Sequence, residues 1–240
     1  MIRKLASWFL LSASLAAAEA PSAPSYEVRY LQGWAVHVRS ELLTPEKKTL
    51  TEARLSLVAQ QLIEIVRVVP AAAVTELRKI PLWISPPYPK IPLRAEYHPG
   101  ADWLKKNGRD PAMAKGVEFT NFDILDKEVL RMPMLALHEL AHGYHDRVLG
   151  TNQPDIKACF DRAVANKSYD KVSRKNWQGK ITPNVKAYAM TNPHEFFAET
   201  SEAFFGENDM FPFNRKELEQ HDLETVAMLK KVWTEGAIKR

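Results

Sequence analysis

The chain has 240 residues, of which 45% are hydrophobic and 26% charged, which is the composition of a globular protein rather than of a disordered or fibrous one. Its net charge of +4 is small, and its basic residues are interspersed with acidic ones, so we expect no nucleic-acid partner. Cys159 is the only cysteine, so the chain can form no internal disulfide and must rely on its hydrophobic core.

The N-terminus has the pattern of a secretory signal peptide. A positively charged start is followed by a short apolar run, Leu5 to Leu15, and by the small-residue sequence Ala18-Glu19-Ala20. The alternative is a retained membrane anchor, but the apolar run is too short to cross a bilayer. We therefore expect a signal peptide over 1–20, one domain over 21–240, a secreted or periplasmic location, and no stable membrane insertion after cleavage.

Apolar periodicity predicts the elements of the first half. In chain order we expect one or two strands over 26–42 with Gly33 at a turn, a helix over 51–69 that Pro70 ends, a helical piece over 72–78, a strand over 80–84, an irregular stretch over 94–118, and a strand over 116–122.

The second half is predicted to be mostly helical. Pro133 stands where a helix should begin, apolar residues recur at helical spacing after it, and Gly150 is a natural end. Further helices are expected near 154–167, 193–205 and 215–234. Strands that precede helices without regular alternation predict an α+β domain.

The sequence His138-Glu139-Leu140-Ala141-His142 lies inside the helix predicted from Pro133. Positions i and i+4 share one helix face, so His138 and His142 can direct their imidazoles at a single metal ion. A catalytic zinc needs a third protein ligand and an open position for water. Glu139 would lie beside that open position, where a carboxylate can take a proton from water as it attacks a carbonyl group.

Spacing leaves the third ligand open between two carboxylates. His145 is excluded because it lies about 10 Å along the helix axis from the first histidine, and it is expected at the surface or in the cleft. Asn192 is a plausible helix cap that precedes Pro193, so Glu195 and Glu199 lie one turn apart. Both could be ordinary capping or surface residues, but phenylalanines surround them, and a metal would offset their burial.

These residues give the chain a resemblance to the gluzincin metallopeptidases, in the branch that contains the catalytic domain of anthrax toxin lethal factor and its small secreted bacterial relatives. The shared motifs are the histidine motif and the block from Tyr188 to Glu199. The resemblance implies a zincin-like fold and one Zn²⁺ per chain. It implies the following roles: His138, His142 and Glu195 as ligands, Glu139 as the base, Tyr188 beside the metal as a hydrogen-bond donor in catalysis, and Glu199 as the carboxylate that orients His138.

The resemblance also implies a peptide or protein substrate. The strand expected at Gly116–Phe122 directly precedes the histidine helix, where such peptidases often have an edge strand that pairs with an extended substrate. One alternative is a catalytically inactive zincin-like domain whose zinc only fastens helices 133–149 and 193–205 together. Another is a metal-free scaffold with a chance histidine pair. An intact Glu139 favours the secreted zinc peptidase, because a structural site needs no base.

Overall fold

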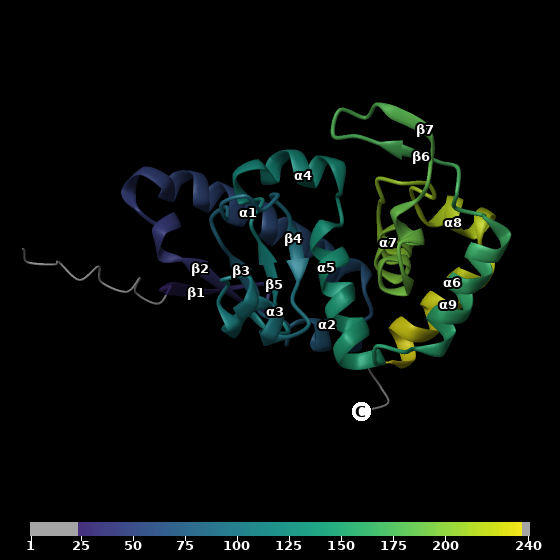
Figure 1. Ribbon diagram of the computed structural model, residues 1–240, viewed down its shortest axis with the longest axis horizontal. Coiled ribbons are helices and arrows are strands. Elements are labelled where there is room, and N and C mark those ends of the chain that lie inside the picture. The colour runs from purple at the N-terminus through teal and green to yellow at the C-terminus, as the bar shows by residue number, and fades with distance from the viewer. Residues whose placement is uncertain (1–23, 237–240) are drawn as a thin grey trace, which may run out of the picture.

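The computed structural model describes residues 24–236, so the signal peptide expected at 1–20 lies outside the described residues. Its larger sheet has the strand order β1-β2-β3-β5-β4, in which β1 and β4 lie at the edges (Figure 1). The hairpin β1–β2 and the pair β4–β5 are antiparallel, whereas β2, β3 and β5 run parallel. The strands are β1 (Tyr26–Leu31), β2 (Trp34–Arg39), β3 (Leu82–Ile84), β4 (Ala95–Tyr97) and β5 (Val117–Phe119).

Helices make up most of the second half of the described chain, and the mixture of helices and small sheets confirms the α+β class. A separate hairpin, β6 (Val172–Lys175) and β7 (Ile181–Val185), interrupts them. The helices are α1 (Pro45–Val68), α2 (Ala71–Leu77), α3 (Ala101–Lys106), α4 (Leu125–Arg131), α5 (Leu135–Tyr144), α6 (Pro154–Asn166), α7 (Pro193–Phe205), α8 (Arg215–His221) and α9 (Leu223–Glu235).

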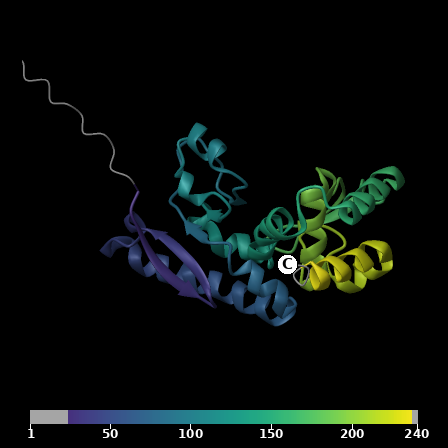
Figure 2. The same cartoon turned by 90° about the horizontal axis from the view of Figure 1, so that it is seen from below.

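The first hairpin and the first long helix form where the periodicity predicts them. Gln32 and Gly33 both have positive φ, 51° and 91°, which is the backbone of a two-residue hairpin turn. Alternate residues of β2 are buried and share one core with the inner face of α1, which Figure 2 shows against the sheet. Because helix α1 begins at Pro45, it is six residues longer at its start than expected.

Helix α5 lies between the two halves of the molecule. It packs against α1, β4 and β5 on one side and against α7 on the other (Figure 1). It begins at Leu135 rather than at Pro133, and it continues as one turn of π-helix over His145–Leu149 before Gly150 ends it with a φ of 84°. Nine of its ten residues are buried, so its position is fixed from both sides.

The expectation that Gly116–Phe122 forms the edge strand is wrong. That segment contains β5, which pairs with β3 on one side and with β4 on the other, so β4 is the edge. Glu118 and Thr120 are fully buried, so proline at either position would disrupt the sheet and would not test substrate pairing. The irregular stretch expected around residues 94–118 therefore includes the exposed edge of the sheet.

Other differences concern short elements. The helix expected over 215–234 is two helices, because Asp222 ends α8 and its carboxylate accepts a hydrogen bond from Thr225 N at the start of α9. Neither α4 nor the hairpin β6–β7 was predicted. Among residues 24–236, no helix combines the length and the apolarity that crossing a bilayer requires.

Candidate metal centre

Two packed helices bring the expected ligands together. Helix α5 carries His138 and His142 on the face that meets α7. The start of α7 is set by Asn192, whose side-chain oxygen accepts hydrogen bonds from the backbone N–H groups of His194 and Glu195 at 2.8 and 3.0 Å. This is the cap that the sequence predicts, and it places Glu195 in the first turn of α7, facing α5.

The three candidate donor atoms form a nearly equilateral triangle. The Nε2 atoms of His138 and His142 are 3.2 Å apart, and Glu195 Oε2 lies 3.2 Å from the first and 3.3 Å from the second. A tetrahedral zinc with bonds near 2.0–2.1 Å separates its ligand atoms by about 3.3 Å. The triangle therefore has the size that one tetrahedral zinc ion requires.

The surroundings of these atoms also suit a cation. Glu195 Oε2 is buried and has no hydrogen bond from any described residue. Burial opposes a charge on Glu195, but its contacts with both histidines outweigh burial and hold its pKa below the ordinary value. An ionised carboxylate and two imidazole nitrogens supply three electron-pair donors to one point in a buried site. This arrangement fits a bound metal ion.

The carboxylate that holds His138 is Glu202, and the expectation that Glu199 has this role is wrong. His138 Nδ1 lies 2.7 Å from Glu202 Oε1 but 3.8 Å from Glu199 Oε1. A proton shared between Nδ1 and Glu202 leaves the lone pair of Nε2 pointing at the triangle. Burial lowers the pKa of His138, yet Glu195 and Glu202 together raise it well above its ordinary value, so a metal ion that binds Nε2 must displace a proton from it.

Glu199 has a different partner. Its Oε2 accepts a hydrogen bond of 3.2 Å from the side chain of Asn208, and its side chain is 2% exposed. Burial first, and then the nearby Glu202, raise the pKa of Glu199 to about 8. Glu199 is therefore a protonated, buried neighbour of the site at neutral pH, and it is not positioned as the third ligand.

Glu139 is held by the edge strand rather than by another side chain. Its Oε2 accepts a hydrogen bond of 2.9 Å from the backbone N–H of Tyr97 in β4. The side chain of Tyr97 is itself fixed at its hydroxyl, which donates a hydrogen bond of 2.6 Å to Asp146. Lys115 contacts the same carboxylate. Burial raises the pKa of Glu139 to about 7, which suits a group that must accept a proton near neutrality.

Tyr188 lies beside the site, as the resemblance implies. It belongs to a short 3-10 turn, Tyr188–Met190, directly before α7. Its hydroxyl is 3.5 Å from Glu195 Oε1, and its side chain is 51% exposed towards the cleft, so it is not a core aromatic. Burial and the charge of Glu195 raise its pKa, so the hydroxyl keeps its proton at neutral pH and can donate it.

His145 is not at the surface or in the cleft, contrary to expectation. It is 1% exposed, its ring centroid lies 4.4 Å from that of His194, and neither ring nitrogen has a hydrogen-bond partner among the described residues. Burial lowers the pKa of His145 to about 3, so the ring is neutral and acts as part of the core.

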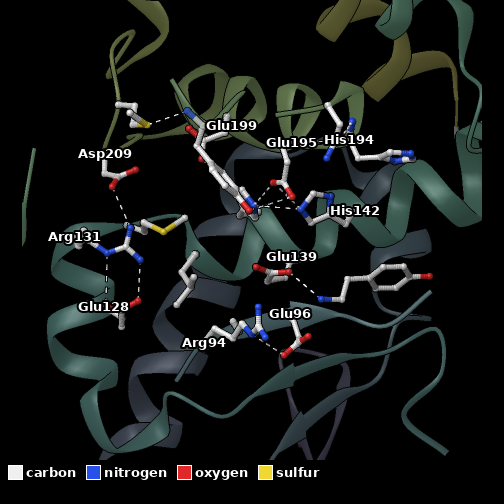
Figure 3. Close-up of a pocket in the computed structure, with 18 of the residues that line it drawn as sticks. Arg94, Glu96, Glu128, Arg131, Glu139, His142, His194, Glu195, Glu199 and Asp209 are labelled. Carbon is white, nitrogen blue, oxygen red and sulfur yellow. Dashed lines mark hydrogen bonds and ion pairs between the residues drawn. The ribbon is translucent and has the colours of Figure 1, made fainter. Parts of the chain in front are cut away.

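The site lies on a cleft of about 770 Å³, which is large enough for several residues of a peptide. Strand β4 and α5 form one wall, and the start of α7 with the segment before it forms the other. Figure 3 shows Arg131 and Asp209 at one end of the cleft, Glu139 and Glu195 in the middle, and His194 at the other end.

Two residues of this site, Glu202 and Tyr97, were missed in the sequence. Glu202 had a signal, because it lies at i+7 from Glu195 and so on the same face of α7. The contact of Tyr97 had none, because it uses a backbone N–H. Comparisons with protein-family models, with curated proteins and with solved structures give no match, so the function must be inferred from the motifs and the site itself.

Proposed function

We propose that the protein is an exported zinc metallopeptidase with a zincin-like domain. One observation carries the proposal: the donor triangle of His138, His142 and Glu195 has the size of a tetrahedral zinc site, and Glu139 lies beside it in an open cleft. A structural zinc site is closed by four protein ligands, whereas a catalytic one keeps a position open. Three protein donors beside a cleft favour the catalytic type.

The remaining groups have roles that follow from their positions. A zinc ion held by this triangle would polarise a substrate carbonyl and acidify a water molecule. Glu139, oriented by the N–H of Tyr97, accepts the proton of the attacking water and passes it to the leaving amine. The Tyr188 hydroxyl donates a hydrogen bond to the charge that develops on the carbonyl oxygen.

The edge strand supports a peptide as the substrate. Arg94 and His98 direct their backbone groups at the segment that contains β5. The N–H of Thr120 donates a hydrogen bond to the carbonyl of Arg94, and the N–H of His98 donates one to the carbonyl of Gly116. Because the direction alternates along a strand, Ala95 and Tyr97 direct theirs at the cleft. An extended peptide can add to β4 through these groups and so place a peptide bond beside Glu139.

The experiment is to measure zinc and peptide cleavage together on residues 21–240. We expect one zinc per chain, cleavage within a mixed peptide library, and loss of cleavage when a chelator removes the metal. Glu195→Gln should lose zinc, whereas its neighbour Glu199→Gln should largely retain it, because only Glu195 belongs to the triangle. Glu139→Gln should keep zinc and lose cleavage.

Two outcomes would change the conclusion. Stoichiometric zinc without cleavage of any library peptide would favour the alternative in which zinc only fastens α5 to α7 in a binding or structural domain. No bound metal after zinc is added to the purified protein would refute a metal centre of either kind.

A further inference from the structure

The hairpin β6–β7 is the most strongly charged segment beside the cleft. Residues 171–186 contain five cations and no carboxylate: Lys171, Arg174, Lys175, Lys180 and Lys186. Arg174 and Lys186 line the cleft. Val172 pairs with Val185 at the base of the hairpin, Arg174 pairs with Thr182 further along the ribbon, and Lys186 follows directly after β7.

The hairpin and α4 both lie at the top of the molecule in Figure 1, and side chains connect them. At the tip, the Lys127 ammonium of α4 lies 5.7 Å from the centre of the Trp177 ring. At the cleft, Arg131 of α4 and Arg174 of β6 bind the same oxygen of Asp209 at 3.0 and 3.1 Å. We call these two segments, α4 and β6–β7, the end wall.

The end wall presents more cations to the cleft than it has carboxylates to balance them. Arg131 is held by Glu128 at 2.8 Å and shares Asp209 with Arg174. Both carboxylates are thereby engaged, and no carboxylate among residues 24–236 forms an ion pair with Lys186. The three cations Arg131, Arg174 and Lys186 therefore face two carboxylates, which leaves one positive charge unbalanced. The Lys186 ammonium and the half-exposed Arg174 guanidinium are the groups that can meet a ligand in the cleft.

The direction of β4 decides which part of a peptide meets the end wall. Tyr97 lies over the C-terminal end of α5, where its hydroxyl reaches Asp146, and Arg94 lies on the Arg131 side of Glu96 (Figure 3). Strand β4 therefore runs away from the end wall. A peptide that pairs with it antiparallel, which is the more stable arrangement, runs towards the end wall with its C-terminal half.

We propose that the end wall is a carboxylate-binding subsite, formed by Lys186 and Arg174, for the part of the substrate on the C-terminal side of the cleaved bond. The inference rests on the proposed peptide-binding function of the cleft. The carboxylate comes either from an acidic side chain or from the free C-terminus of a short product, and the two sources have the same chemistry.

Binding and cleavage are measured separately, so that the carboxylate-binding subsite and the proposed peptidase function are tested independently. The protein is zinc-loaded Glu139→Gln, residues 21–240, which should bind peptides without cutting them. The probes are fluorescein-labelled Ala/Val peptides that carry Glu or Gln in the C-terminal half, each with a free or an amidated C-terminus, and a set with Glu in the N-terminal half. Fluorescence anisotropy gives the affinities. Cleavage of the mixed library by the wild-type chain tests the proposed function independently.

We expect peptides with a carboxylate in the C-terminal half to bind more tightly than the matching peptides in which Gln or an amidated C-terminus replaces it. Adding Lys186→Gln should lower the affinity for these peptides alone, by about fivefold, because it removes one partly exposed ion pair. Arg174→Gln should act in the same direction. Lys180→Gln, which removes an equal charge from the same hairpin but does not line the cleft, is the matched control and should change nothing.

The pattern of preference identifies the source of the carboxylate. Preference for Glu in amidated peptides indicates an acidic side chain, and preference for the free C-terminus in Gln peptides indicates a C-terminal carboxylate. Three outcomes would overturn the inference, whatever the library shows. The first is equal affinity for acidic peptides and for their Gln or amidated counterparts. The others are an equal loss of affinity in Lys180→Gln and Lys186→Gln, and an absence of binding by every peptide.

Discussion

Replacing Glu202 by glutamine should weaken zinc binding although Glu202 is not a ligand. Its Oε1 lies 2.7 Å from His138 Nδ1, and its side chain is fully buried, so this is a charge-assisted hydrogen bond that water does not screen. Loss of such a partner of a metal-binding histidine costs about 10–100-fold in metal affinity, which is about 1.4–2.8 kcal/mol.

Glu199→Gln is the matched control. It replaces a second buried carboxyl group on the same face of α7, but Glu199 lies 3.8 Å from His138 Nδ1 and its hydrogen bond is to Asn208. The assay is competition with a chromophoric chelator at pH 7, with unfolding of the zinc-free proteins as a check of the fold. Zinc should also raise the melting temperature less in Glu202→Gln than in Glu199→Gln. A larger loss of affinity in Glu199→Gln would refute the assignment.

Three further predictions concern the surroundings of the site. Tyr97→Phe removes the hydroxyl that ties β4 to Asp146, so we expect kcat to fall by about tenfold at unchanged zinc content; equal kcat would show that the tie does not position Glu139. Contacts with His98, Tyr88 and Arg109 outweigh burial and lower the pKa of Glu118, so its stabilisation is present above about pH 4.5 and is lost below it. Glu118→Gln should therefore cost about 3–5 kcal/mol in urea unfolding at pH 7, with a difference that narrows at lower pH; a constant difference would contradict the assignment. Gly143→Ala would place a methyl group 2.6 Å from Ile80 Cδ1, so we expect a loss of about 1–3 kcal/mol in the same assay, and an unchanged midpoint would show that the contact relaxes freely.

The parts of the site that sequence could predict are local. The cap at Asn192 and the spacing of His138 and His142 depend on residues within one or two turns, and both form as expected. Strand β4 has only three residues, and its identity depends on pairing with β5, some twenty residues later in the chain. The choice of Glu202 over Glu199 depends on how α7 is rotated against α5, which helix periodicity alone does not determine.

In the proposed peptidase, the contact between Tyr97 and Glu139 would link the pairing of the substrate with β4 to the chemistry at Glu139. An antiparallel peptide can form both backbone hydrogen bonds with Ala95, but the N–H of Tyr97 is already donated to Glu139. The peptide residue opposite Tyr97 therefore keeps a carbonyl oxygen that no backbone donor of β4 binds, at the point of the strand nearest the base. A strand that paired fully with an antiparallel peptide would bind the carbonyl of every second peptide residue. In the proposed peptidase, the missing donor at Tyr97 would leave the carbonyl opposite it available for the chemistry beside Glu139, and this would favour one peptide bond over its neighbours along the strand.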